Sequence, residues 1–203
     1  MPPRVITFVT GNAKKLAEVQ AILAAAAGAA APGAPAPSFT LASAALDLPE
    51  LQGSPEAVAS AKALAAAALV AGPVVTEDTS LCFAALGGLP GVYVRHFLEA
   101  VGPAGLSRML DGFEDKAAVA QCIFAYCAGP GAPPRLFVGR TPGAVVRPRA
   151  PQGADAFGWD PVFLPDGHAA TYAEMDKAVK NGISHRYKAL TALAEWLAAN
   201  PDA

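Results

Sequence analysis

A short polar run near the start of the chain has the composition of a phosphate-binding turn. Thr10-Gly11-Asn12-Ala13-Lys14-Lys15 follows an apolar stretch and precedes apolar residues at helical spacing. A turn between a strand and a helix presents backbone N–H groups and the positive end of the helix dipole, and both attract a phosphate. Two lysines in the first helical turn work against that dipole, so a bound anion would explain them. We therefore expect this turn to hold phosphates.

Acidic residues follow two other strand-like segments. Glu50 ends one of them, and the pair Glu77-Asp78 ends another. Carboxylates at the strand ends of an α/β protein point into the crevice where ligands bind, and two or three of them can hold Mg²⁺ together with water and substrate phosphates. Each acid taken singly is more readily explained as a solvated loop residue. The position of Glu77-Asp78 between two apolar segments favours the metal site.

Cationic residues at further places could help to offset the charge of a triphosphate. Lys62 stands alone, whereas Lys180-Asn181-Gly182 and Ser184-His185-Arg186 gather donors at the start of the last helix, as the first turn also does. Isolated lysines are usually solvated surface groups, and Lys14 could simply pair with Glu18 one helical turn away.

Two aromatic rings flank a glycine in Phe157-Gly158-Trp159-Asp160. Such rings can stack on a nucleobase, and Asp160 beside them could accept a hydrogen bond or help to hold a metal ion. An aromatic anchor that fixes this loop to the core explains the spacing at least as well.

The overall composition limits the classes of partner. The 203 residues carry a formal net charge of −2, which argues against a general nucleic-acid binder, although a local lysine cluster can still bind a small anion. The cysteines Cys82, Cys122 and Cys127 have no zinc-type or Cys-x-x-Cys spacing and favour a reducing compartment. The sequence shows neither a signal-peptide pattern nor a membrane-spanning run. We therefore expect a cytoplasmic protein that binds neither nucleic acid nor membranes.

The elements that must position these residues follow from the hydrophobic pattern. Strands and helices alternate early and strands gather in the middle, which indicates an α/β protein with a mixed sheet. No repeat or composition break marks a domain boundary, so we expect one domain over 1–203. Strands are expected at Val5–Val9, Phe39–Leu48, Pro73–Thr76, Ala117–Ala128 and Arg135–Arg147, and helices around Leu16–Leu23, from Ser54, at Val94–Leu98, at Leu106–Leu110 and at Ser184–Ala199.

Six segments resemble, in order, those of the inosine triphosphate pyrophosphatase family, whose members remove non-standard purine nucleotides. The segments are Phe8–Leu16, Asp47–Gly53, Glu77–Phe83, Gly87–Gly91, Phe157–Pro161 and Lys180–Arg186. Any one of them is a weak signal, whereas six in the family's order are specific. Gly112–Lys116 and Tyr172–Met175 are most similar to the eukaryotic members. The Ala/Pro-rich stretch Ala24–Pro37 looks longer than in the family, and it lies outside every matching segment.

The resemblance implies hydrolysis of ITP, dITP and XTP to the monophosphate and pyrophosphate, with Mg²⁺ as cofactor and Mn²⁺ as an alternative ion. It also implies a homodimer and an elongated two-lobed α/β fold with a long mixed sheet and a central active-site cleft. Glu50 and Asp78 would bind the metal, and Asp78 would accept a proton. The positions that the resemblance assigns to substrate binding are Thr10, Gly11, Asn12, Ala13, Lys14, Lys15, Lys62, Thr79, Phe157, Gly158, Trp159, Asp160, Lys180, His185 and Arg186.

The sequence leaves two alternatives open. A non-catalytic purine-nucleotide binding or sensing module could use the same scaffold, although it has less need for the acids Glu50 and Asp78 beside phosphates. A pyrophosphatase for another modified base, oxidised or methylated, would also fit the segments. If the chain acts on ITP and XTP, donors such as Arg186 in a buried site could pair with the 6-oxo group of the purine. The amino group of adenine would leave these donors unpaired.

Overall fold

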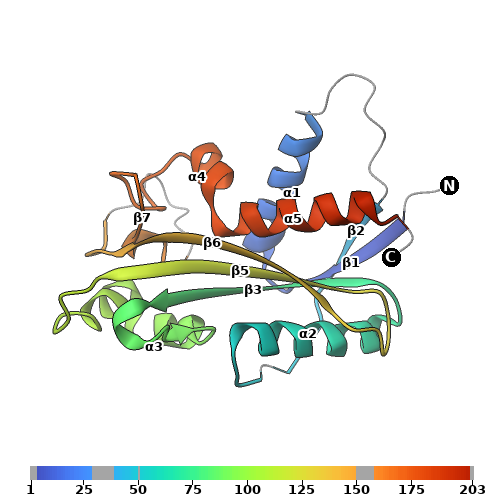
Figure 1. Cartoon of the computed structure of the whole chain (residues 1–203), viewed down its shortest axis with the longest axis horizontal. Helices are drawn as coiled ribbons and strands as arrows, with labels where there is room; N and C mark the ends of the chain where they lie inside the picture. The colour runs from blue at the N-terminus through green and yellow to red at the C-terminus, as the bar shows by residue number, and fades with distance from the viewer. Residues whose placement is uncertain (1–3, 29–38, 50, 150–157, 202–203) are drawn as a thin grey trace. The chain divides into compact units, whose positions relative to one another are not determined.

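The structure of the chain is a computed structural model that describes residues 4–28, 39–49, 51–149 and 158–201 (Figure 1). Two candidate site residues, Glu50 and Phe157, lie outside the described residues, as does the 29–37 part of the Ala/Pro-rich stretch. The elements in chain order are β1 (Arg4–Val9), α1 (Ala13–Gly28), β2 (Phe39–Ala44), α2 (Pro55–Val70), β3 (Val74–Phe83), η1 (Ala84–Leu86), β4 (Pro90–Gly91), α3 (Val94–Arg108), β5 (Ala117–Cys127), β6 (Arg135–Val145), η2 (Asp160–Val162), β7 (Phe163–Pro165), α4 (Lys177–Ile183) and α5 (His185–Ala199).

The strands form a mixed sheet. Within the described residues the sheet has seven strands, six of them in the order β2-β1-β3-β5-β6-β7, and the seventh, β4, pairs with β3 outside this path. β1 runs parallel to both β2 and β3, whereas the pairs β3–β4 and β6–β7 are antiparallel. The α/β class with a mixed sheet is therefore confirmed.

The chain divides into two compact units, each assembled from separate stretches. Unit 1 comprises Met1–Asp78, Ile123–Val138 and Arg186–Ala203, and unit 2 comprises Thr79–Cys122 and Gly139–His185. The expectation of a single two-lobed domain stays a prediction.

In unit 1 the side chains of β5 alternate between the two faces of the sheet, as successive strand residues must. Tyr126 contacts the ring of Trp196 in α5 at 5.4 Å between centroids. The residues on either side of Tyr126 pack with alanines of α2, so α2 covers one face and α5 the other (Figure 1). The cluster between β5 and α2 contains Ile123, Ala125 and Cys127 of β5 with Ala59, Ala63, Ala66 and Ala67 of α2.

The start of α2 follows its sequence signals. The backbone N–H of Ala57 donates to Ser54 Oγ at 3.2 Å, which makes Ser54 the helix cap. Pro55 occupies the first turn without losing a bond, because its missing N–H would have no partner inside the helix. The expected helix from Ser54 is therefore confirmed.

Unit 2 has its own apolar core, built on β3, α3 and the region around β7. The two short helices expected here form one assigned helix, α3, with a kink. Gly102 has φ 65° and ψ −179°, and Pro103 follows it, so the helical conformation is interrupted at that point. None of the described helices is long and apolar enough to cross a membrane.

Candidate functional site

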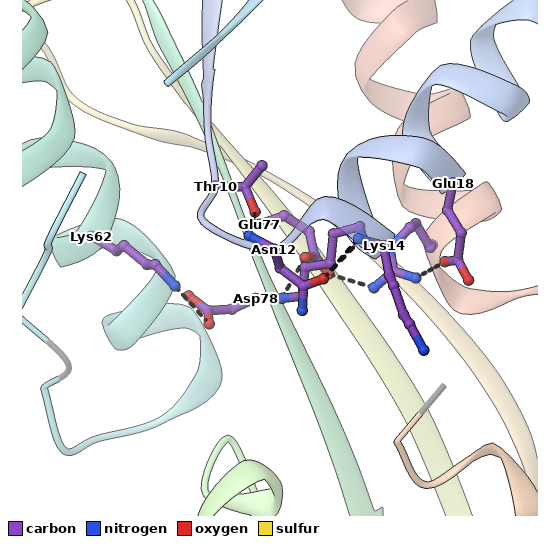
Figure 2. A network of polar contacts seen from close by, with 9 residues as sticks. Thr10, Asn12, Lys14, Glu18, Lys62, Glu77 and Asp78 are labelled. Carbon is purple, nitrogen blue, oxygen red and sulfur yellow. Dashed lines mark hydrogen bonds and ion pairs between the residues drawn. The ribbon is translucent and has the colours of Figure 1, made fainter. Parts of the chain in front are cut away.

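The turn after β1 is held by its own side chains. The backbone N–H of Asn12 donates to Thr10 Oγ1 at 3.1 Å. Asn12 Oδ1 in turn accepts the backbone N–H groups of Lys14 at 3.0 Å and Lys15 at 3.2 Å, so Asn12 caps α1 (Figure 2). The expectation that these two N–H groups are free for a phosphate is therefore wrong. The position of Gly11 is open, because a Cβ built there would meet nothing within 4 Å.

The acidic pair lies inside a strand and not at the end of one. β3 includes Glu77 and Asp78 and continues to Phe83, so the strand end expected at Thr76 is wrong. The strand extends because Leu81 and Cys82 pair with Gly91 and Pro90 of β4. Local sequence patterns do not predict such a contact between two segments. The pairing of β1 with β3 ends at Val9 and Thr76. Glu77 and Asp78 therefore lie beside the turn that follows β1.

Glu77 is the centre of a buried ion-pair network. Its Oε2 lies 2.6 Å from Lys15 Nζ, and its Oε1 accepts a hydrogen bond from Arg186 Nη2 at 3.3 Å. Arg186 Nη1 also donates to Glu18 Oε2, so Glu18 pairs with Arg186 and the expected pairing with Lys14 is wrong (Figure 2). The side chains of Glu77 and Arg186 are only 1% and 2% exposed. Such buried charges require partners, and this network joins α1, β3 and the first turn of α5.

Only one of the two carboxylate oxygens of Asp78 has a described partner. Its Oδ1 lies 3.1 Å from the Nζ of Lys62, which reaches it from α2 (Figure 2). Its Oδ2 is buried, and no described residue donates a hydrogen bond to it. Burial raises the pKa of Asp78 above its ordinary value of 3.8, with a smaller contribution from Glu77, whereas Lys62 and Lys15 oppose the rise.

The acids suit Mg²⁺ better than a softer metal ion. Mg²⁺ is bound in nucleotide sites by one or two carboxylates together with water and substrate phosphates. The Oδ2 of Asp78, which has no described partner, is an oxygen of the type that Mg²⁺ prefers. Among the described residues no group of three or more His, Cys, Asp or Glu side chains could hold a metal ion. Glu50, the other expected ligand, lies outside the described residues.

Unit 2 contains a second buried ion pair. Asp160 Oδ2 lies 2.6 Å from Lys180 Nζ, and the two side chains are 5% and 9% exposed. Lys180 belongs to α4, a helix that the sequence analysis did not predict and that Asp176 caps through the N–H of Ala178. The expectation that Lys180 lies at the start of the last helix is therefore wrong. His185 does begin that helix.

Trp159 is buried in the core of unit 2. Its side chain is 3% exposed and contacts Phe163 edge-on at 5.6 Å and His185 at 5.4 Å between centroids. Gly158 before it has φ +53°, a left-handed conformation that favours glycine. These contacts favour the core-anchor reading for Trp159, and base stacking stays a prediction.

Two candidates contribute less to the described contacts. The side chain of Lys14 is exposed, and no described carboxylate pairs with it, so it is available to a ligand. Thr79 is half-buried and follows Asp78 on β3. Sequence reasoning missed the roles of Glu18 and Glu77 as partners of Arg186. Glu18 lies one helical turn from Lys14 and Lys15, whereas Glu77 has no cation near it in the sequence, so nothing local identifies the pairing.

Comparison with known proteins gives a consistent result over almost the full chain. Residues 6–196 match the Ham1 family. The inosine triphosphate pyrophosphatase of Tuber melanosporum (strain Mel28) is 53% identical over 199 residues, which cover 98% of this chain and 100% of that protein. The inosine triphosphate pyrophosphatase of Batrachochytrium dendrobatidis (strain JAM81 / FGSC 10211) is 53% identical over 197 residues, covering 97% of this chain and 96% of that protein.

Solved structures agree with this match. A HAM1 protein from Coxiella burnetii has a TM-score of 0.79 at 27% identity and covers 96% of this chain and 98% of its own. A nucleoside-triphosphatase / dITP/XTP pyrophosphatase from Mycobacterium abscessus has a TM-score of 0.68 at 28% identity and covers 93% and 97%. Sequence match, relatives and fold thus agree, and the chain belongs to the Ham1 family, which includes the inosine triphosphate pyrophosphatases.

Proposed function

We propose that this chain hydrolyses ITP, dITP and XTP to the nucleoside monophosphate and pyrophosphate. The observation that carries the proposal is the gathering of Lys15, Lys62 and the acids Glu77 and Asp78 beside the turn after β1. Relatives named inosine triphosphate pyrophosphatase, 53% identical to this chain over almost its full length, support the same reaction.

The phosphates would be held by the turn and its lysines. Asn12 fixes the backbone of the turn through its cap, so the first residues of α1 need no rearrangement when a ligand binds. Lys14 and Lys15 place two cations in the first turn of α1, and Lys62 adds a third from α2. Several cations of this kind are needed to offset the charge of a triphosphate.

Asp78 would act on the water that attacks the α phosphorus. Asp78 and Glu50 would hold Mg²⁺, which neutralises phosphate charge and polarises the phosphoryl group when it is bound. The water oxygen forms a bond to the α phosphorus, the bond to the bridging oxygen breaks, and pyrophosphate leaves. Asp78 accepts the proton of the water, and its raised pKa makes it a better proton acceptor near neutral pH than an ordinary carboxylate.

The base and nucleotide would be held by residues around Asp160. Trp159, Asp160, Lys180 and His185 lie together in unit 2. Donors there would pair with the 6-oxo group of hypoxanthine or xanthine and would lose their partner opposite the amino group of adenine. Phe157 and Gly158 are further members of this proposed set, whereas Arg186 belongs to unit 1 and is held there by Glu18 and Glu77.

The test is to incubate the purified protein with ITP and Mg²⁺ and to identify the products. IMP and pyrophosphate are expected, with much slower turnover of ATP. Release of orthophosphate, or equal rates on ITP and ATP, would contradict the proposal. Tight ITP binding without turnover would instead support a nucleotide-sensing module, and a panel of oxidised and methylated nucleotides separates the remaining alternative.

We also propose that the protein is a homodimer. Two large apolar side chains of α3 in unit 2 are exposed, Phe97 at 38% and Val101 at 49%, and exposed apolar residues of this kind occur at interfaces. Sedimentation at micromolar concentration should give twice the mass of the 203-residue chain. A monomer would contradict this part of the proposal.

A further inference from the structure

Glu77 has a role that the proposed mechanism does not assign. Both of its carboxylate oxygens face cations, Lys15 on one side and Arg186 on the other, and its side chain is 1% exposed. A Mg²⁺ ligand needs an oxygen that is not already paired with a protein cation. The Oδ2 of Asp78 has no described partner, whereas Glu77 faces Lys15 through Oε2 at 2.6 Å and Arg186 through Oε1 at 3.3 Å.

We propose that Glu77 is a positioning residue that fixes Lys15 of α1 against Arg186 of α5 and that it does not bind the metal ion. The proposal rests on the proposed pyrophosphatase activity and assigns a part of its machinery. The four charges form an alternating row, Glu18, Arg186, Glu77 and Lys15, in which acids and cations balance. Removing one member of a buried row leaves an uncompensated charge, so each member holds its neighbours in place.

The two cations of this row have different access to a ligand. Arg186 is held by two carboxylates and is 2% exposed, so its guanidinium is largely committed to the protein. Lys15 lies at the end of the row and is 17% exposed. Its ammonium group carries three N–H donors, and Glu77 is its carboxylate partner, at 2.6 Å. The row therefore presents Lys15 to a phosphate with its position already set.

A positioning role, a metal-binding role and a purely structural role predict different kinetics for Glu77→Gln. Glutamine keeps the size of the side chain and removes its charge. If Glu77 positions Lys15, kcat falls because the ammonium is misplaced, and a misplacement of about 1 Å can cost about 10²-fold. KM for ITP should not rise, since the loss of a negative charge leaves the site more attractive to a polyanion. The Mg²⁺ concentration that gives half-maximal rate should not change.

The matched control is Glu195→Gln, which makes the same change on an exposed position of α5. Steady-state kinetics with ITP, a Mg²⁺ titration and thermal unfolding are measured for wild type and both variants. We expect about 10²-fold lower kcat for Glu77→Gln alone. A rise of about 10-fold or more in the Mg²⁺ requirement would make Glu77 a metal ligand and overturn the proposal. A lower melting temperature with unchanged kcat would make its role structural only and also overturn it.

A second comparison covers the case in which Glu77→Gln does not fold. The double variant Glu77→Gln/Lys15→Met removes an acid and a cation together, so it leaves no new unpaired charge on that side of the row. Its kcat should equal that of Lys15→Met alone, because Glu77 acts through Lys15. A further loss of about 10²-fold in the double variant would overturn the proposal. Wild-type turnover of ITP is the separate readout for the activity itself, so an inactive wild type rejects the proposed function and not the positioning role.

Discussion

Lys62 Nζ lies 3.1 Å from Asp78 Oδ1, and the two side chains are 19% and 22% exposed. A cation of α2 is therefore paired directly with the carboxylate that we propose as the proton acceptor. Burial still raises the pKa of Asp78, because desolvation outweighs the attraction of Lys62 and Lys15. Ionisation of Asp78 therefore costs more free energy in the folded protein than in the unfolded chain.

Replacing Lys62 with methionine should lower kcat/KM for ITP by about 10-fold or more, since the variant loses both a phosphate-binding cation and the partner of Asp78. Steady-state kinetics at fixed Mg²⁺ measure the effect. Lys188→Met, an exposed position on α5, is the control and should leave kcat/KM unchanged. Equal kinetics for the two variants would remove Lys62 from the site.

Asp78→Asn should abolish turnover and raise the melting temperature at pH 7 in metal-free buffer. The pKa of Asp78 is higher in the folded protein than its ordinary value of 3.8, so between these two values the folded state binds more protons than the unfolded state. Stability therefore falls as the pH rises through that window, and asparagine removes this cost. The gain should shrink as the pH approaches 3.8. A variant that melts below wild type at pH 7 would contradict the pKa argument.

Asn12→Ala should both destabilise the protein and impair catalysis. Loss of the α1 cap costs about 1 kcal/mol, and the turn that carries Lys14 and Lys15 loses its fixed backbone. The matched variant Ser54→Ala removes the cap of α2 at a similar cost in stability. Thermal unfolding should therefore give similar shifts for the two variants, whereas only Asn12→Ala should raise KM for ITP. Unchanged KM in Asn12→Ala would exclude a role for the turn in phosphate binding.

Trp159→Ala should destabilise the protein by about 3–5 kcal/mol, because the indole is buried among apolar side chains of unit 2. Denaturant unfolding measures this cost. Trp159→Leu keeps an apolar side chain and removes the aromatic ring, so it separates the two interpretations of this residue. A large loss of nucleotide affinity in Trp159→Leu beyond its loss of stability would support base stacking, and unchanged affinity would support the core anchor.

Local features of the sequence predicted the elements whose causes are local. The cap at Ser54 and the strand before Thr10 depend on neighbouring residues, and both were confirmed. The continuation of β3 through Asp78 depends on pairing with β4. No pattern along one strand reveals that pairing.

For the candidate site too, the sequence predicted features with local causes and missed contacts between distant residues. The sequence identified Lys15, Lys62 and Asp78 as candidates, and the structure brings them together beside the turn after β1. The sequence could not predict that Arg186 contacts Glu77, because the two residues are 109 positions apart and the contact exists only after the chain has folded. The same reason explains the wrong pairing of Glu18 with Lys14, which was the partner available within one helix.

The most direct test of the mechanism follows the oxygen of the attacking water. The wild-type protein is incubated with ITP and Mg²⁺ in water enriched in ¹⁸O. The products are then separated, and their masses are measured by mass spectrometry. Attack at the α phosphorus predicts that the label enters IMP and that pyrophosphate leaves without it. Label in the pyrophosphate, or in released orthophosphate, would contradict the account.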